Sequence, residues 1–202
     1  MAAAREGGHI ALCGGTTPKR AYELAASLEP RWPKVELWFG DERAVPPSDP
    51  RSNYHLVREA LLDRLGGRPP AAVHRVRGER GAAEAAALYD AELDGVTLSF
   101  SLNGIGPDGH TASLFPHTPA LAETERRAVV AEAGLEPLVE RVTMTPPVFA
   151  TAELLVYLAT GAEKAEAVRR AFAEPPDPAC PASLVRGRRT VAVLDAAAAA
   201  LL

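Results

Sequence analysis

Cysteine is scarce in this sequence of 202 residues: it has only Cys13 and Cys180, and neither lies in a CxxC pair. This argues against a disulfide framework or a cysteine-based zinc site, both of which need several suitably spaced cysteines. No window approaches the roughly 18 apolar residues of a membrane span, and the N-terminus lacks the cationic and apolar regions of a signal peptide. We therefore expect a cytoplasmic protein that does not enter a membrane.

Basic charge is also limited. The 22 Lys and Arg residues are outnumbered by 26 Asp and Glu residues, which gives a net charge of −4 and a sequence pI of about 5.8. Domains that bind nucleic acid typically have a basic surface and a high pI, so we expect no nucleic-acid partner. An anionic ligand would have to be held by a few placed cations rather than by a field over the whole molecule.

Several signatures of catalysis are missing. No serine lies in a GxSxG elbow, and neither an HExxH motif nor a Walker loop is present, so we expect no metal and no cofactor. Hydrophobic residues make up 47% and charged residues 24%, as is ordinary for a globular protein. The length suits one α/β domain with a substantial core, and we expect residues 1–202 to form that single domain.

Apolar runs alternate with helical periodicity along most of the chain. Strands are expected at residues 9–14, 35–39, 73–76, 97–102, 128–131, 141–145, 154–159 and 190–194. Helices are expected at 18–28, 53–65, 81–93 and 163–172, with an alanine-rich terminal helix at 195–202. This order predicts a largely parallel sheet with helices on both faces. Ligands of such sheets bind beyond the carboxyl ends of the strands.

The segment LCGGTTPK at residues 12–19 follows the first expected strand and opens a helix. Gly14 and Gly15 let the backbone approach a ligand, and Thr17 can cap the helix ahead of Pro18. Exposed amides at such a helix start, including that of Thr16, favour an anion such as phosphate. An ordinary capped turn is the alternative interpretation.

Two further strand ends carry cations. Arg43, in the charged triplet Asp41-Glu42-Arg43, can offer a planar fork to a phosphate or carboxylate, with Asp41 or Glu42 orienting it. Lys164 lies in the first turn of an expected helix, where a cation is unfavourable unless it shares a bound anion with the helix amides. A solvated charged turn and a solvated lysine are the alternatives. Residues 52–54 are interpreted as a helix cap.

The loop NGIGPDGHTASLFP at residues 103–116 satisfies the dinucleotide pattern GxGxxG through Gly104, Gly106 and Gly109. We reject a dinucleotide site because Pro116 stops the crossover helix that this fingerprint needs. The loop instead places Asp108 two residues before His110. A neutral imidazole can take a proton from water, and an adjacent carboxylate can fix its tautomer. A loop histidine that caps the next turn is the alternative.

These segments give the sequence a specific resemblance. The stretches GGTTPKRAYELAA, WFGDERAVPPSDPRSNYHLVREALL, GIGPDGHTASLFP, RVTMTPPVF, LATGAEKAEAVRRAF and PASLVRG resemble, in order, the 6-phosphogluconolactonase family. The resemblance implies a Rossmann-like three-layer α/β/α fold and hydrolysis of 6-phospho-D-glucono-1,5-lactone to 6-phospho-D-gluconate in the oxidative pentose phosphate pathway. It implies no cofactor and a small sugar-phosphate lactone as the partner. The oligomeric state is left open.

From the motifs and the resemblance together we assign candidate site residues. The candidate catalytic residues are His110 as general base, Asp108 and Arg43. The candidate residues for binding substrate and its phosphate are Gly14, Gly15, Thr16, Thr17, Asp41, Gly106, Gly109 and Lys164. Loop amides near Gly106 and Gly109 are candidates for stabilising the oxyanion.

The sequence departs from the family pattern in two ways. Relatives usually have a further strand and helix before the glycine-rich loop, so we expect shortened N-terminal elements here. Asn103 stands where an apolar residue usually ends the strand. The competing functions are a sugar-phosphate isomerase or amino-sugar-phosphate deaminase of the same superfamily, and a non-catalytic sugar-phosphate sensor.

Overall fold

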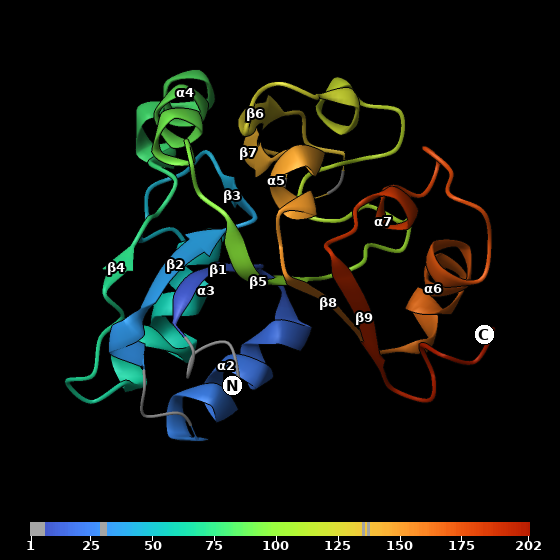
Figure 1. Cartoon of the computed structure of the whole chain (residues 1–202), viewed down its shortest axis with the longest axis horizontal. Helices are drawn as coiled ribbons and strands as arrows, with labels where there is room; N and C mark the ends of the chain where they lie inside the picture. Colours follow the sequence, from blue (N-terminus) through green and yellow to red (C-terminus); the bar gives the residue numbers. More distant parts are fainter. Residues whose placement is uncertain (1–6, 29–31, 135, 137) are drawn as a thin grey trace.

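The computed structural model describes residues 7–28, 32–134, 136 and 138–202. Within these residues, six strands form a sheet in the order β4-β2-β1-β5-β8-β9, and every neighbouring pair is parallel (Figure 1). The strands are β1 (Gly8–Leu12), β2 (Val35–Phe39), β4 (Ala72–Val73), β5 (Leu98–Asn103), β8 (Leu154–Ala159) and β9 (Arg189–Leu194). This is the order of a doubly wound sheet, and the winding reverses between β1 and β5.

Helices cover both faces of this sheet, which confirms the predicted α/β architecture. They are α2 (Thr16–Leu28), α3 (Asn53–Ala60), α4 (Ala82–Glu92), α5 (Pro146–Ala150), α6 (Ala165–Phe172) and α7 (Pro181–Leu184). Side chains of a strand point alternately to its two faces. Ile10 and Leu12 therefore enter the core under α2 and α3, whereas Ala11 enters the core under α4, α5 and α6.

A second sheet of three antiparallel strands stands beside the first. It joins β3 (Asp41–Arg43), β7 (Arg141–Met144) and β6 (Ala128–Ala131), in that spatial order. The alternative interpretation of residues 41–43 as a solvated charged turn does not hold, because their backbone pairs with β7 from Arg141 to Thr143. Gly40 connects the two sheets, since its N–H donates to Leu12 O at 2.9 Å and its carbonyl accepts from Met144 N at 2.8 Å.

Two helix predictions were also wrong. The helix expected at 53–65 ends at Ala60, and a 3₁₀ turn, η2 (Leu62–Arg64), follows a break at Leu61. The break turns both Leu61 and Leu65 into the core. Residues 195–202 form successive turns rather than a helix, with Ala199 N bonded to Asp195 O and Leu202 N bonded to Ala199 O. Alanine content alone does not stabilise so short a helix.

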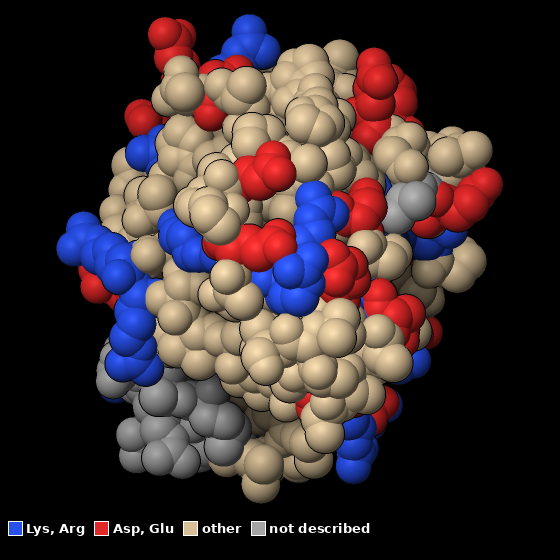
Figure 2. Space-filling view, turned by 90° about the vertical axis from the view of Figure 1, so that its right-hand side faces the viewer, with Lys and Arg blue, Asp and Glu red and all other residues tan. Residues whose placement is uncertain are grey.

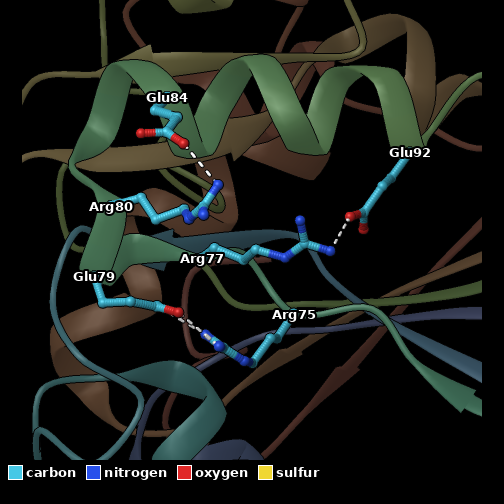
Figure 3. Close-up of polar contacts among 6 residues, drawn as sticks. All are labelled: Arg75, Arg77, Glu79, Arg80, Glu84 and Glu92. Atoms are coloured by element: carbon cyan, nitrogen blue, oxygen red, sulfur yellow. Dashed lines mark hydrogen bonds and ion pairs between the residues drawn. The ribbon is translucent and has the colours of Figure 1, made fainter.

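The strand expected at 73–76 is shorter than predicted and covers only Ala72–Val73. The following segment carries three Arg–Glu pairs, which join it to the 3₁₀ helix η3 (Gly78–Arg80) and to α4 (Figure 3). The pairs are Arg75–Glu79, Arg77–Glu92 and Arg80–Glu84, at 2.6–2.7 Å. No helix within the described ranges has the length and apolar character needed to cross a bilayer.

Candidate functional site

A cavity of about 300 Å³ opens at the carboxyl ends of β1, β2, β5 and β8, where the winding of the sheet reverses. This is the location that doubly wound sheets use for ligands. The predicted site residues that line it are Gly14, Gly15, Thr16, Thr17, Asp41, Arg43, Gly106, His110 and Lys164. Asp108 and Gly109 lie in the same loop as His110 but are not among the lining residues.

The glycine-rich loop forms one wall. Helix α2 begins at Thr16, so the expectation that Thr17 caps the helix ahead of Pro18 was wrong. The Thr17 hydroxyl instead lies 3.0 Å from the Thr160 hydroxyl at the end of β8. Gly15 has φ +101°, a backbone conformation that glycine adopts without steric cost. The first turn of α2 thus faces the cavity with backbone amides that have no partner inside the helix.

Asp108 and His110 form a short hydrogen-bonded unit. Asp108 Oδ1 lies 2.5 Å from His110 Nδ1 and also accepts from the backbone N–H of His110 at 3.1 Å. Burial opposes ionisation of Asp108, but these bonds and the proximity of His110 outweigh it and lower the pKa of the carboxyl. The carboxylate therefore holds Nδ1 as the donor, which leaves Nε2 as the ring nitrogen able to accept a proton.

The backbone of this loop closes tightly around the imidazole. A Cβ on Gly106 would lie 2.0 Å from His110 Nδ1, so only glycine fits beside the ring. Gly106 N donates to His110 O at 2.8 Å, and Gly109 N donates to Gly106 O at 3.0 Å. Among the loop amides near Gly106 and Gly109 that were candidates for stabilising an oxyanion, these two are committed to bonds within the loop. Ala182 N supports the loop from α7 by donating to Gly109 O at 2.9 Å.

Strands β3 and β7 bring two arginines to the opposite wall. Arg43 was predicted from the sequence. Its guanidinium donates to Arg51 O, and Glu42 accepts from its backbone N–H rather than from its side chain. Arg141 was missed. It lines the cavity, is 4% exposed and lies over the ring of Phe115 at 5.5 Å. Burial and the nearby charge of Arg43 lower the pKa of Arg141, while Asp41 opposes the shift.

The carboxylate of Asp41 is fixed by two side chains. Its Oδ1 accepts from Asn53 Nδ2 at 2.9 Å, and its Oδ2 accepts from Ser113 Oγ at 2.6 Å. Asn53 also lines the cavity and was missed, because residues 52–54 were interpreted only as a helix cap. A Cβ on Gly14 would lie 1.8 Å from Asn53 Oδ1. The first glycine of the loop therefore allows close packing against Asn53.

The buried carboxylate of Glu42 binds the start of α3 through several hydrogen bonds. It accepts from Ser52 Oγ at 2.9 Å and from the backbone N–H groups of Arg43, Asn53 and Tyr54 at 2.7–2.8 Å. Burial raises the pKa of Glu42, although these hydrogen bonds oppose the shift. Ser52 is also the N-cap of α3, as predicted, since its hydroxyl accepts from His55 N at 3.1 Å. One buried carboxylate thus joins β3 to the start of α3.

Lys164 closes the cavity from the end of β8. It ends the 3₁₀ turn η5 (Ala162–Lys164) and is the N-cap residue of α6, so the prediction that it lies within the first turn of the helix was off by a residue. Asp195, after β9, supports this loop by accepting from Gly161 N at 3.1 Å. Glu163 also lines the cavity. Nothing in the spacing of this segment distinguished Glu163 from an ordinary exposed helix residue.

The lining is more positive than the protein as a whole. It contains the cations Arg43, Arg141 and Lys164 but only two carboxylates, of Asp41 and Glu163, in a chain of net charge −4. On the face shown in Figure 2, basic and acidic side chains are intermixed. Positive charge is therefore supplied locally, by a few residues. Within the described residues, no three His, Cys, Asp or Glu side chains are grouped as a metal ion needs.

This arrangement combines three capabilities in one cavity. The start of α2 and Lys164 can hold an anion such as phosphate. Paired arginines can stabilise negative charge that develops on an oxygen. His110, held by Asp108, can remove a proton from water.

Comparisons with known proteins show which family the chain is similar to. The model of a family described as glucosamine-6-phosphate isomerases/6-phosphogluconolactonase matches residues 1–194. The chain is similar to the 6-phosphogluconolactonase of Haemophilus influenzae, with 34% identity over 205 residues that cover 96% of this chain and 87% of the relative. It is 38% identical over 186 residues to that of Synechocystis, covering 87% and 76%. The crystal structure of 6-phosphogluconolactonase from Thermotoga maritima superposes with a TM-score of 0.83 at 27% identity, covering 93% of this chain and 84% of that one.

Proposed function

The chain belongs to the glucosamine-6-phosphate isomerase/6-phosphogluconolactonase family, and we propose that it hydrolyses 6-phospho-D-glucono-1,5-lactone to 6-phospho-D-gluconate with His110 as general base. The observation that carries the mechanism is the Asp108–His110 pair at the wall of a cationic cavity. The matching relatives are named for this lactonase activity.

In the reaction, water attacks the carbonyl carbon of the lactone while neutral His110 takes one of its protons. A C–O bond forms at C1, and the carbonyl electron pair moves onto its oxygen. When the tetrahedral species collapses, the bond from C1 to the ring oxygen breaks, and the imidazolium returns the proton to that oxygen. The product is open-chain 6-phosphogluconate, whose carboxyl group then ionises.

The other lining residues have separate roles in this proposal. Asp108 accepts from Nδ1–H of His110 and stabilises the imidazolium that forms. Lys164 and the amides at the start of α2, around Gly15 and Thr16, hold the phosphate. Arg43 and Arg141 face the substrate from β3 and β7, where two guanidinium groups can stabilise the oxyanion.

We place this reaction in the cytoplasm, as a step of the oxidative pentose phosphate pathway. Both cysteines are buried free thiols, as is usual in a reducing compartment. The substrate is a small sugar-phosphate lactone, and none of the roles above requires a cofactor.

A pH-stat assay with freshly made 6-phosphogluconolactone, corrected for its spontaneous hydrolysis, tests the proposal. We expect acid release that is faster than the uncatalysed rate and proportional to enzyme concentration. The family also includes glucosamine-6-phosphate isomerases, so aldose and ketose phosphates and glucosamine 6-phosphate belong in the same substrate panel. Turnover of one of those compounds without lactone hydrolysis would replace this proposal with the isomerase or deaminase alternative.

A further inference from the structure

A line of buried polar side chains runs behind the His110 loop. Ser101 and Asn103 lie on β5 with 0% and 2% exposure, and Thr111, directly after His110, is 1% exposed. Strand interiors usually hold apolar residues, because a buried polar group costs free energy unless it is hydrogen-bonded. These side chains offset that cost by forming hydrogen bonds with one another.

The hydrogen bonds have a consistent direction. Ser101 Oγ donates to Asn103 Oδ1 at 2.6 Å, and Asn103 Nδ2 donates to Thr111 Oγ1 at 3.2 Å. The line thus connects β5 to the His110 loop. Thr111 is its link to the loop.

The loop needs such support because the residue after Thr111 has a strained backbone conformation. Ala112 has φ +51°, and a residue with a Cβ rarely adopts this conformation unless its surroundings impose it. Polar bonds hold both of its neighbours: Asn103 binds Thr111, and Asp41 accepts from Ser113 Oγ. Fixing residues on both sides of Ala112 fixes the direction in which the chain leaves His110.

We propose that Asn103 and Thr111 are positioning residues for His110, an inference that rests on the proposed function. Their hydrogen bond sets the backbone at residues 110–111, so that Nδ1 stays on Asp108 while Nε2 faces the substrate. Neither residue lines the cavity. Their effect on catalysis passes through His110, and loss of the bond lowers kcat while leaving substrate binding intact.

The test compares three variants that share one contact. Thr111→Val keeps the shape of the side chain and removes the hydroxyl, whereas Thr111→Ser keeps the hydroxyl. Asn103→Leu removes the amide at similar volume. We expect Thr111→Val and Asn103→Leu each to lower kcat about tenfold with KM within about twofold, as one lost hydrogen bond in the transition state allows. Thr111→Ser retains most of kcat. The double variant should have about the same kcat as the slower of the two single variants, because both substitutions remove the same bond.

Two further readouts separate positioning from a general loss of stability. In Thr111→Val the acid limb of the kcat profile shifts to lower pH, since the imidazolium loses part of its interaction with Asp108. The ¹⁵N NMR signals of the His110 imidazole change without any substrate present. Wild-type kcat and unchanged imidazole signals in a folded Thr111→Val variant would overturn the proposal, as would a Thr111→Ser variant as slow as Thr111→Val. Absence of lactone hydrolysis in the wild type would instead contradict the proposed function, and the NMR comparison would still test the positioning.

Discussion

Asp108 Oδ1 and His110 Nδ1 lie 2.5 Å apart, although only one residue separates them in the chain. The loop achieves this because Gly106 leaves space for the ring and the Gly106 N–H binds His110 O. The same carboxylate oxygen also accepts from His110 N. A carboxylate held this way fixes the imidazole and its tautomer before any substrate arrives.

The first prediction concerns this carboxylate. Asp108→Asn should lower kcat by about 10- to 100-fold, a typical loss for part of a general-base unit. Because the pKa of Asp108 is lowered, the carboxylate remains ionised over the acidic range in which an imidazole protonates. Its loss disfavours the imidazolium, so the acid limb of the kcat profile should move to lower pH. An unchanged limb would show that Asp108 does not act on His110.

The general layout of the site could be predicted from the sequence. Strand ends followed by glycines and charges indicated a site at the carboxyl edge of a parallel sheet, and the structure brings Gly14, Arg43, His110 and Lys164 to one cavity there. Arg141 could not be placed, because a charged residue in a short strand shows its direction only once β7 pairs with β3.

Local hydrogen bonds explain the other differences. The sequence left a solvated charged turn open as the alternative at residues 41–43, and tertiary pairing makes them a strand. Glycine amides look available in a sequence, but those of Gly106 and Gly109 are consumed by the loop itself. Such contacts depend on backbone geometry that composition and periodicity do not encode.

The second prediction concerns phosphate binding. Lys164→Ala should raise KM by about one to two decades, since a charged hydrogen bond is worth roughly 1.5–3 kcal/mol, with a smaller effect on kcat. Lys19→Ala is the matched control, because Lys19 lies exposed on α2 and is not among the cavity residues. Equal effects of the two substitutions in steady-state kinetics would remove Lys164 from the site.

The third prediction tests the same contact from the side of the ligand. Unphosphorylated gluconolactone should be a poor substrate for the wild type, with kcat/KM lower by about two decades or more because phosphate binding is absent. Lys164→Ala should have little further effect on this substrate. Measuring both lactones with both proteins gives a thermodynamic cycle of the same form as a double-mutant cycle, in which removal of the phosphate takes the place of the second mutation. An equal effect of the substitution on the two lactones would contradict a phosphate contact.

The fourth prediction concerns stability. Glu42→Gln places an amide N–H₂ against groups that are all donors, so it should lower the free energy of unfolding by about 1–3 kcal/mol at neutral pH. Because the pKa of Glu42 is raised in the folded protein, the native state binds a proton at this carboxylate more tightly than the unfolded state does. Its contribution to stability therefore falls as pH rises from the ordinary range of glutamate through the raised value, and Glu42→Gln removes that dependence.

A matched control for this substitution is available on the surface. Glu84 pairs with Arg80 in an exposed ion pair (Figure 3), and such pairs contribute about 0–1 kcal/mol. Glu84→Gln should therefore change stability by less than about 1 kcal/mol in urea unfolding at several pH values. Similar losses for the two variants would mean that the buried bonds of Glu42 contribute no more than a surface pair.

The central claim is that His110 is the general base, and steady-state kinetics of a folded His110→Ala variant test it most directly. General-base catalysis typically contributes 10²–10⁴-fold, so kcat for 6-phosphogluconolactone should fall by about 100-fold or more. KM should stay within a few-fold, because the interaction is made in the transition state. A folded His110→Ala variant with near wild-type kcat would contradict the account and leave catalysis to positioning and electrostatics alone.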